Sequence, residues 1–279
     1  AEMCIRDSNN FGSVLQRQGN YDGALACLER ALELVADFPP ALSNMGGISH
    51  RKNCQDEAIQ FFKRALAIDP DYPEAHFNYT EVMLLTQSDL REGWKEHRWR
   101  WKKREFYNQF RDFGVPLWDG SDLRGKWIAV WGEQGVGEEI IYASMVPDLI
   151  EAGAEVVIEC DPRLVPLFER SFENVKCLVR RHTRPDYSEQ LDFHMPMGDL
   201  GFWVRPERDS FPSRKNYLRA DLKRRKALRT SYLDGSDSIL IGLSWFSRNP
   251  EIGWEKSIDL MDWLPLLEVP GVTLSLIHI

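Results

Sequence analysis

The feature that most constrains this chain is a pattern that recurs every 34 residues within its first hundred positions. A shift of this length brings Asn10, Asn44 and Asn78 into register. The same shift aligns small and apolar residues in pairs: Gly12 with Gly46, Ala24 with Ala58, Ala31 with Ala65, Leu32 with Leu66, and Ala41 with Ala75. This period is typical of stacked helix-turn-helix units, in which small residues let two helices cross closely. The pattern therefore predicts a helical solenoid.

Two segments of this pattern closely resemble tetratricopeptide repeats: NNFGSVLQRQGNYDGALACLERALEL and SNMGGISHRKNCQDEAIQFFKRALAIDPDYPEA. The resemblance is specific over residues 9–75 and includes the Asp69-Pro70 pair that ends a helix. A third copy begins at Asn78 but needs one inserted residue before its small residue at Gly93. We therefore expect the last copy to be a modified, capping repeat.

The capping segment reads GWKEHRWRWKKREF and closes a repeat domain expected over residues 9–104. Trp94, His97 and Trp101 recur at three- and four-residue intervals, which predicts one helix face packed on a second domain. The opposite, solvated side is expected to carry three cations: Arg98, Lys102 and Lys103. Interleaved tryptophans and cations also suit stacking on nucleic acid. The net charge of −8, from 35 Lys and Arg against 43 Asp and Glu, disfavours that alternative.

Composition and the two ends of the chain limit the class of protein to which this sequence can belong. Residues 1–8 and the final SLIHI resemble translated sequencing adapters, so we expect the natural protein to be longer at both ends. The five cysteines lack the close pairing of zinc or redox sites, which predicts reduced, structural thiols. Neither a bilayer-spanning apolar run nor a signal peptide is recognisable. We therefore expect a soluble, cytoplasmic protein without a metal or a cofactor.

Beyond a linker at residues 105–125, apolar runs alternate with helical patterns. Strands are predicted at 127–131, 154–160 and 175–179, and helices at 138–152 and 164–172. This alternation predicts parallel strands joined by right-handed crossovers, hence a doubly wound α/β sheet over residues 126–235. A second unit of the same kind, residues 236–279, is expected to hold a strand at 238–246, a helix at 258–269 and a strand at 271–276. Two strands cannot form a stable domain alone, so this unit is expected to be truncated.

Two stretches carry a second resemblance: EQGVGEEIIYASMVPDLIEAGAEVVIECDPRLVPLFERSF and SWFSRNPEIGWEKSIDLMDWLPLL. With the repeats, they make residues 9–274 resemble a bacterial tetratricopeptide-repeat protein fused to a glycosyltransferase domain of the two-Rossmann GT-B type. The similarity is to heptosyltransferase-like families and, in architecture, to the O-GlcNAc-transferase-like enzymes that attach sugars to proteins. It implies that the first sheet binds the acceptor and the second binds a nucleotide-sugar.

The loop WGEQGVGEEIIY follows the first strand and leads into a helix. Gly135 and Gly137 are expected to adopt backbone angles closed to other residues, so that amide groups and the positive helix end face a ligand. The resemblance implies that Glu138 is the general base on the acceptor hydroxyl. The alternative is that Glu138 only stabilises the helix N-terminus. Polar contacts in this loop are expected from Glu133 and Gln134, with turn stabilisation as the rival interpretation.

His194 lies at the end of another predicted strand. Its imidazole is expected to line the cleft and contact the acceptor or a donor phosphate, unless it is structural. In the second unit, the resemblance implies that four residues hold the donor diphosphate: Ser244, Ser247, Arg248 and Lys256. Two hydroxyls and two cations can stabilise a departing diphosphate without a metal. The alternative is that the two cations are ordinary loop charges.

Rival catalytic motifs are missing from the sequence, including the lysine of a nucleoside-triphosphatase loop, the Gly-x-Ser-x-Gly elbow and the His-Glu-x-x-His helix. Two functions remain open. The first is an inverting, metal-independent sugar transfer whose protein or glycan acceptor is recruited by the concave face of the repeats. The second is a non-catalytic interaction scaffold with a degenerate transferase domain. Under the first, we expect the 279-residue chain by itself to be inactive.

Overall fold

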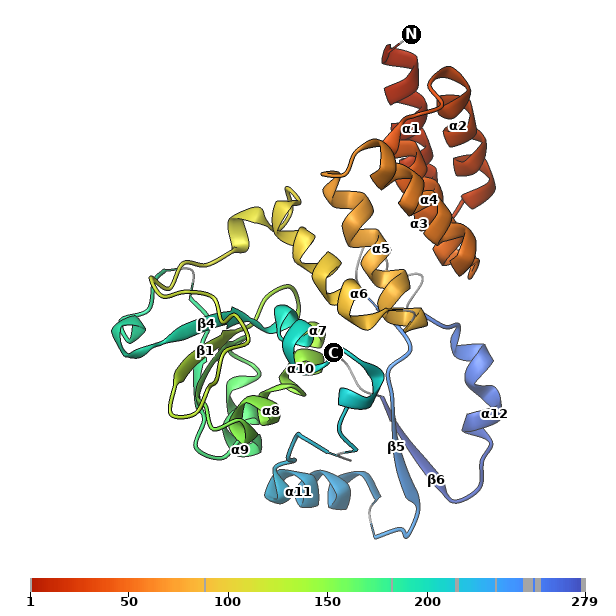
Figure 1. The fold of residues 1–279 in the computed structure, drawn as a ribbon. Helices are drawn as coiled ribbons and strands as arrows, with labels where there is room; N and C mark the ends of the chain where they lie inside the picture. The colour runs from red at the N-terminus through yellow and green to blue at the C-terminus, as the bar shows by residue number, and fades with distance from the viewer. Residues whose placement is uncertain are drawn as a thin grey trace. The chain divides into compact units, whose positions relative to one another are not determined.

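The structure is a computed structural model that describes residues 2–87, 89–181, 183–213, 216–233, 235–247, 253 and 257–276. The chain divides into two compact units, Ala1–Arg219 and Ala220–Ile279. The first unit holds both the predicted repeats and the predicted first sheet (Figure 1). The second holds a short pair of strands.

The repeat region is a run of helices: α1 (Glu2–Arg17), α2 (Tyr21–Leu34), α3 (Pro39–Arg51), α4 (Gln55–Ile68), α5 (Pro73–Thr86) and α6 (Leu90–His97), followed by the 3-10 helix η1 (Arg98–Lys102). Each odd-numbered helix packs against the next, as Figure 1 shows. Local sequence sets these starts, because prolines open α3 and α5, and the side chains of Asn20 and Asp89 accept backbone hydrogen bonds at the starts of α2 and α6. The predicted helical solenoid is confirmed.

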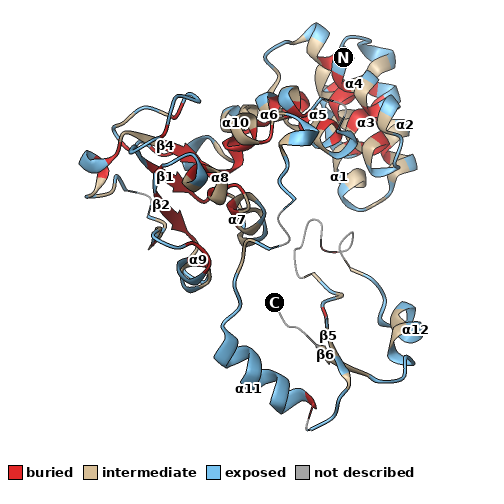
Figure 2. Ribbon diagram, turned by 60° about the horizontal axis from the view of Figure 1, so that its bottom comes forward, coloured by how far each residue is buried: buried red, intermediate tan, exposed pale blue. Residues whose placement is uncertain are grey.

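The small residues of the repeat pattern fill the helix crossings. The side chains of six alanines are fully buried: Ala24, Ala31, Ala41, Ala58, Ala65 and Ala75. Gly46 lies so close to the ring of Phe62 that an added Cβ would come within 2.7 Å of its Cε1 atom. The recurrence of small residues therefore reflects close helix packing. Figure 2 shows buried residues in the repeat helices and in the strands of the first sheet.

The sheet of the first unit has four parallel strands: β1 (Trp127–Trp131), β2 (Glu155–Cys160), β3 (Lys176–Val179) and β4 (Phe193–Pro196). Their order is β3-β2-β1-β4. The predicted parallel sheet is confirmed, and the bounds of β1 match the prediction. The α-helices that follow these strands are α7 (Val136–Ala143), α8 (Val146–Glu151), α9 (Val165–Ser171) and α10 (Gly201–Val204).

The helix predicted over 138–152 is two helices. Pro147 lies in the first turn of α8. A proline there cannot donate to the carbonyl four residues earlier and would clash with it, so a continuous helix cannot pass through. The break falls between Ala143 and Val146. The prediction of one helix was wrong for this reason.

The two faces of the sheet are covered differently. Ile128 and Val130 pack with apolar residues of the helices, including Leu149 and Phe168. On the other face, Ala129 and Trp131 pack against Phe113 of the linker, Trp101 of η1 and Leu191. None of the described residues in this second cluster lies in an α-helix, and the doubly wound arrangement stays a prediction.

The linker also extends one edge of the sheet. Leu117 forms an isolated parallel bridge with His194 of β4. The amide of Trp118 donates to the carbonyl of His194 at 3.1 Å, and the amide of His194 donates to Pro116 at 3.1 Å. The segment predicted as a linker is thus partly built into the fold.

In the second unit, α11 (Leu222–Leu233) precedes β5 (Ile239–Leu243), which pairs in parallel with β6 (Val272–Leu276). Between these strands lie η6 (Leu260–Trp263) and α12 (Leu264–Leu267). The remaining short 3-10 helices are η2 (Tyr107–Gln109), η3 (Ser188–Gln190), η4 (Met197–Asp199) and η5 (Arg208–Ser210). None of the described helices has the length and apolar character needed to span a bilayer.

Candidate functional site

Arg100 lies in η1 and is fully buried. Its Nε and Nη2 atoms donate to the two carboxylate oxygens of Glu133 at 2.7 and 2.6 Å. Its Nη1 atom donates to Asp199 at 2.6 Å and to Nδ1 of His97 at 3.0 Å. Gly198 adds a backbone donor to Glu133 at 3.0 Å. One guanidinium therefore joins the repeat region to the loops after β1 and β4.

The position of this network matters for ligand binding. In open α/β sheets, ligands bind at the carboxyl ends of neighbouring strands whose crossovers run in opposite directions. In this sheet β1 lies between β2 and β4, so that point lies beyond β1 and β4. Glu133 follows β1 and Asp199 follows β4. Arg100 thus occupies the place where such folds usually hold a ligand.

Burial governs the electrostatics of this network. Burial raises the pKa of Glu133, against the opposing influence of the Arg100 guanidinium. For Arg100, burial acts to lower the pKa, but Asp199 and Glu133 outweigh it and the pKa is raised. Burial, followed by the nearby positive charge of Arg100, lowers the pKa of His97 well below its ordinary value. The histidine is therefore neutral, and its Nδ1 atom can accept the hydrogen bond from Arg100.

The rest of the capping segment packs against the same domain. The indole of Trp94 lies directly over Gly201, where any side chain would collide with it. The Nε1 atom of Trp94 donates to the carbonyl of Arg205 at 2.9 Å. Trp101 packs against Trp131 with ring centres 5.6 Å apart. The predicted packing face is confirmed. Arg100 was not predicted to belong to it, although it follows His97 by three residues.

The loop after β1 differs from the predicted glycine turn. Gln134 has the left-handed φ of 56°, whereas Gly135 has an ordinary φ of −113° and Gly137 lies within α7. The expectation that the two glycines supply special backbone angles was wrong. An added Cβ on Gly135 would lie 2.8 Å from a carboxylate oxygen of Glu138, so this glycine makes room for that side chain.

The two glutamates at the start of α7 differ. Glu138 is half-buried in the first turn of the helix. Glu139 is buried and accepts hydrogen bonds from the amide of Asp161 at 2.8 Å and from Arg180 at 2.9 Å. Burial raises the pKa of Glu139, against the influence of the Asp161 amide and Arg180. Glu139 ties α7 to the loops after β2 and β3, and Glu138 keeps both of its predicted roles open.

His194 is 4% exposed and lies beneath the linker. Its ring stacks on Phe113 with centres 4.9 Å apart, and its Nδ1 atom accepts a hydrogen bond from Trp131 at 3.2 Å. Burial lowers its pKa to about 4. The imidazole is thus neutral and enclosed. Contact between His194 and a ligand stays a prediction, and it would require the linker to move away from the imidazole.

A row of polar side chains crosses the first helices of successive repeats. The amide of Asn44 donates to Asn9 at 3.0 Å, and the amide of Asn78 contacts the hydroxyl of Ser43 at 3.5 Å. Each contact joins residues 35 positions apart, one on α3 and its partner on α1 or α5. Asn44 and Asn78 are half-buried, so this face is polar and partly open to solvent.

Comparison with known proteins identifies this region. Residues 7–71 match the tetratricopeptide repeat family. These residues are tetratricopeptide repeats. Over 95% of its length the chain is 28% identical to Protein FlbA of Caulobacter vibrioides, and it spans 47% of that relative.

Solved structures are also similar over part of the chain. The first repeat domain of Spaghetti (RPAP3) bound to an HSP90 peptide is 18% identical, with a TM-score of 0.34. The match covers 39% of this chain and 89% of the Spaghetti chain. The chaperone SycD of Yersinia enterocolitica in complex with a peptide of the translocator YopD is 17% identical, with the same TM-score of 0.34, and covers 39% and 85%.

The predicted donor site lies in the second unit, outside the tetratricopeptide repeats and the first sheet. Ser244 and Ser247 follow β5. The amide of Ser247 donates to the hydroxyl of Ser257 at 3.0 Å. Arg248 and Lys256 lie outside the described residues. The shared cleft between this segment and the Glu138 loop therefore stays a prediction.

Proposed function

We propose that the tetratricopeptide repeats bind a segment of a partner protein in extended conformation and hold it beside the attached sheet. The observation that carries this proposal is the polar row formed by Asn9, Asn44, Ser43 and Asn78. Side-chain amides can donate to and accept from a peptide backbone at once. Because Asn44 and Asn78 recur at the 34-residue period, their amides are spaced along the solenoid and suit a long, regular ligand.

Peptide selection tests this function. Twelve-residue peptides would be selected by phage display on the 279-residue chain, and their affinities measured by calorimetry. Asn44→Ala with Asn78→Ala is expected to weaken binding about 5- to 100-fold, since each lost hydrogen bond is worth roughly 0.5–1.5 kcal/mol. Lys63→Ala, at an exposed position of α4, is the matched control and should bind normally. Unchanged affinity in the double asparagine variant would exclude this surface.

Sugar transfer by the complete protein is a second proposal, supported by the parallel strand order and by the half-exposed Glu138 beyond β1. The acceptor hydroxyl would give its proton to Glu138 and attack the anomeric carbon, while the bond to the diphosphate breaks with inversion. Four residues would stabilise the leaving diphosphate: Ser244, Ser247, Arg248 and Lys256. The repeats would then recruit the acceptor.

The test of sugar transfer uses the full-length gene product and a panel of nucleotide-sugars. Glu138→Gln is expected to abolish transfer while leaving peptide binding by the repeats intact. Full turnover in this variant would remove the base assignment. Absence of any nucleoside diphosphate binding to the complete protein would instead favour the non-catalytic scaffold.

A further inference from the structure

The outer edge of β3 is an open edge of the first sheet. The opposite edge, at β4, is covered by the linker through Leu117 and Trp118. Within the part of the chain that the structure describes, no strand pairs with the outer side of β3. An uncovered edge offers backbone donors and acceptors to another extended chain.

The sheet register shows which backbone groups of β3 point away from β2. The amide of Arg180 donates to Cys160 of β2 at 2.8 Å. Backbone groups of alternate residues point to opposite sides of a strand. The N–H and C=O groups of Leu178 therefore face β2, and those of Cys177 and Val179 face outward.

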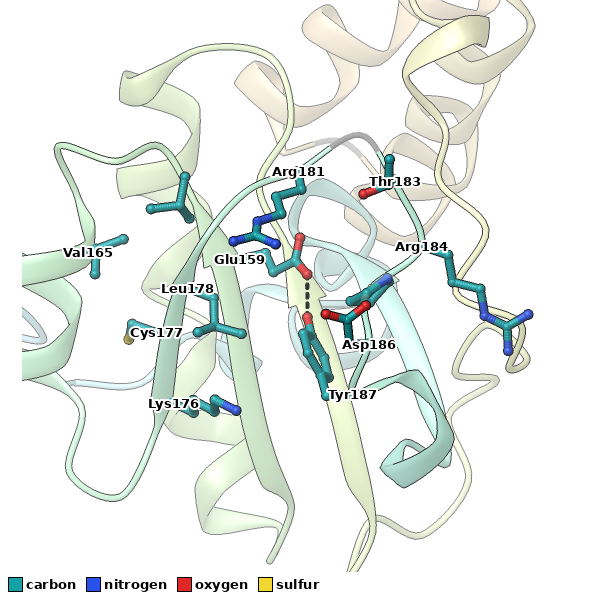
Figure 3. Close-up of a pocket in the computed structure, with 12 residues that line it drawn as sticks. Glu159, Val165, Lys176, Cys177, Leu178, Arg181, Thr183, Arg184, Asp186 and Tyr187 are labelled. Atoms are coloured by element: carbon teal, nitrogen blue, oxygen red, sulfur yellow. Dashed lines mark hydrogen bonds between the residues drawn. The ribbon is translucent and has the colours of Figure 1, made fainter.

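A hollow of about 520 Å³ lies along this edge (Figure 3). Four consecutive residues of β3, from Lys176 to Val179, form one wall, and the loop ending at Tyr187 forms another. The Nζ atom of Lys176 lies 5.5 Å from the centre of the Tyr187 ring. An incoming strand could therefore rest its side chains in this hollow while its backbone pairs with β3.

The charges around the hollow indicate which charge a bound peptide should carry. Lys176 and Arg181 line it, and Asp186 opposes them. Arg184 also borders the hollow, but its side chain points away from it in Figure 3 and donates to the hydroxyl of Ser188 at 3.1 Å. The other carboxylate in the lining, that of Glu159, is buried and already bound by Arg111 and by the hydroxyl of Tyr187. The surplus of positive charge favours an acidic ligand.

We propose that the outer edge of β3 binds an extended, acidic segment of a partner protein as an added strand. Cys177 and Val179 supply the backbone hydrogen bonds, and Lys176 and Arg181 pair with carboxylates of the segment. This site is separate from the polar row of the repeats and does not depend on the proposed sugar transfer. Two peptide surfaces in one unit would let the protein hold two partners, or two parts of one partner.

The test uses the 279-residue chain and a fluorescein-labelled eight-residue peptide that alternates valine and glutamate. We expect saturable binding by fluorescence anisotropy, and none to the same peptide with lysine in place of glutamate. Val179→Pro removes an outward N–H without breaking a sheet hydrogen bond and should weaken binding about tenfold or more. Lys176→Glu with Arg181→Glu should do the same, whereas Lys63→Glu is the matched control.

Amide exchange separates this site from others. On peptide binding, exchange at Cys177 and Val179 should slow, while that of Leu178, already bonded within the sheet, should stay unchanged. Three results would overturn the proposal: no binding of the acidic peptide, unchanged exchange at the two outward amides, or protection of those amides before peptide is added. The proposal would also be overturned if the Asn44→Ala, Asn78→Ala variant lost as much affinity for the acidic peptide as the β3 variants do. That result would show that the peptide binds to the repeats.

Discussion

At the scale of single residues, Arg100 neutralises two buried carboxylates, those of Glu133 and Asp199. Removing one partner of a buried ion pair leaves the opposite charge buried without compensation. Glu133 and Asp199 would both lose their guanidinium in Arg100→Met. We expect this variant to lower the free energy of unfolding by about 3–5 kcal/mol, measured by urea denaturation.

Arg98→Met is the matched control for that experiment. Arg98 lies two residues away, its side chain is 40% exposed, and its Nε atom is 3.7 Å from Asp199. Asp199 is buried, but the long separation and the partly exposed arginine make this a weak pair, for which we expect a contribution of about 0–1 kcal/mol. Similar losses in the two variants would show that the Arg100 network does not stabilise the junction.

His194 should make stability depend on pH. Its pKa is lowered from 6.5 to about 4 by burial, with Asp112 opposing that shift and Arg111 adding to it. Below pH 6.5 the unfolded chain gains a proton at this histidine that the folded chain does not take up until about pH 4. Stability from this group is therefore complete above pH 6.5 and decreases by about 3 kcal/mol as the pH falls to 4.

The measurement compares urea unfolding at several pH values between 7 and 4. His194→Asn keeps an acceptor for Trp131 and removes the titrating group, so its stability should fall less steeply with acid. The neutral His97 acts in the same direction and remains in both proteins. His50→Asn, at a half-exposed position, serves as the control, and parallel profiles for wild type and His194→Asn would contradict the assignment.

Residue roles were predictable only where local chemistry decides them. His194 was correctly placed in a strand, but the prediction that it ends the strand was wrong, because it is the second residue of β4 and pairs with Ala129. Its enclosure comes from Phe113 and the linker, which no local pattern specifies. Arg100 is one of several cations in a basic segment, and residue type alone does not distinguish it from the others. Lys103, predicted on the solvated side, is also largely enclosed, with its side chain 12% exposed. The partners that bury Arg100 are 33 and 99 positions away.

At the scale of elements, the helix crossings of the repeats were predictable because their small residues recur. Gly46→Ala tests this directly, since its Cβ would press on the ring of Phe62. Overpacking of this kind costs about 1–3 kcal/mol. We expect a corresponding loss of stability by thermal unfolding.

Gly47→Ala is the matched control on the same helix. Its Cβ would meet only the end of the Gln16 side chain, at 3.2 Å. Replacing a helical glycine by alanine favours the helix by about 0.5–1 kcal/mol. The neighbouring substitutions should therefore act in opposite directions, and equal destabilisation would refute the crossing argument.

Strand positions were predictable for a different reason. Strands buried on both faces are continuous apolar runs, and Trp127–Trp131 is such a run. The helix over 138–152 was predicted too long because periodicity was given more weight than Pro147. Near the predicted site, the turn depends on Gln134, whose left-handed conformation is uncommon for its residue type.

At the scale of the whole molecule, the repeats and the sheet belong to one unit, and Arg100 joins them. We expect residues 1–219 to unfold in a single transition. Far-ultraviolet circular dichroism reports mainly the repeat helices. Tryptophan fluorescence reports the junction and the sheet, through residues that include Trp94, Trp101, Trp118 and Trp131. The two signals should change at the same urea concentration.

Arg100→Ala should separate those transitions, because the junction loses its buried ion pairs while the helix crossings of the repeats stay intact. Fluorescence would then change at lower urea than circular dichroism. Deleting residues 220–279 should leave the midpoint of the wild-type transition unchanged, since the first unit has its own cores. Separate transitions in the wild-type fragment would mean that the repeats and the sheet unfold independently. The ion pairs of Arg100 would then not couple their unfolding.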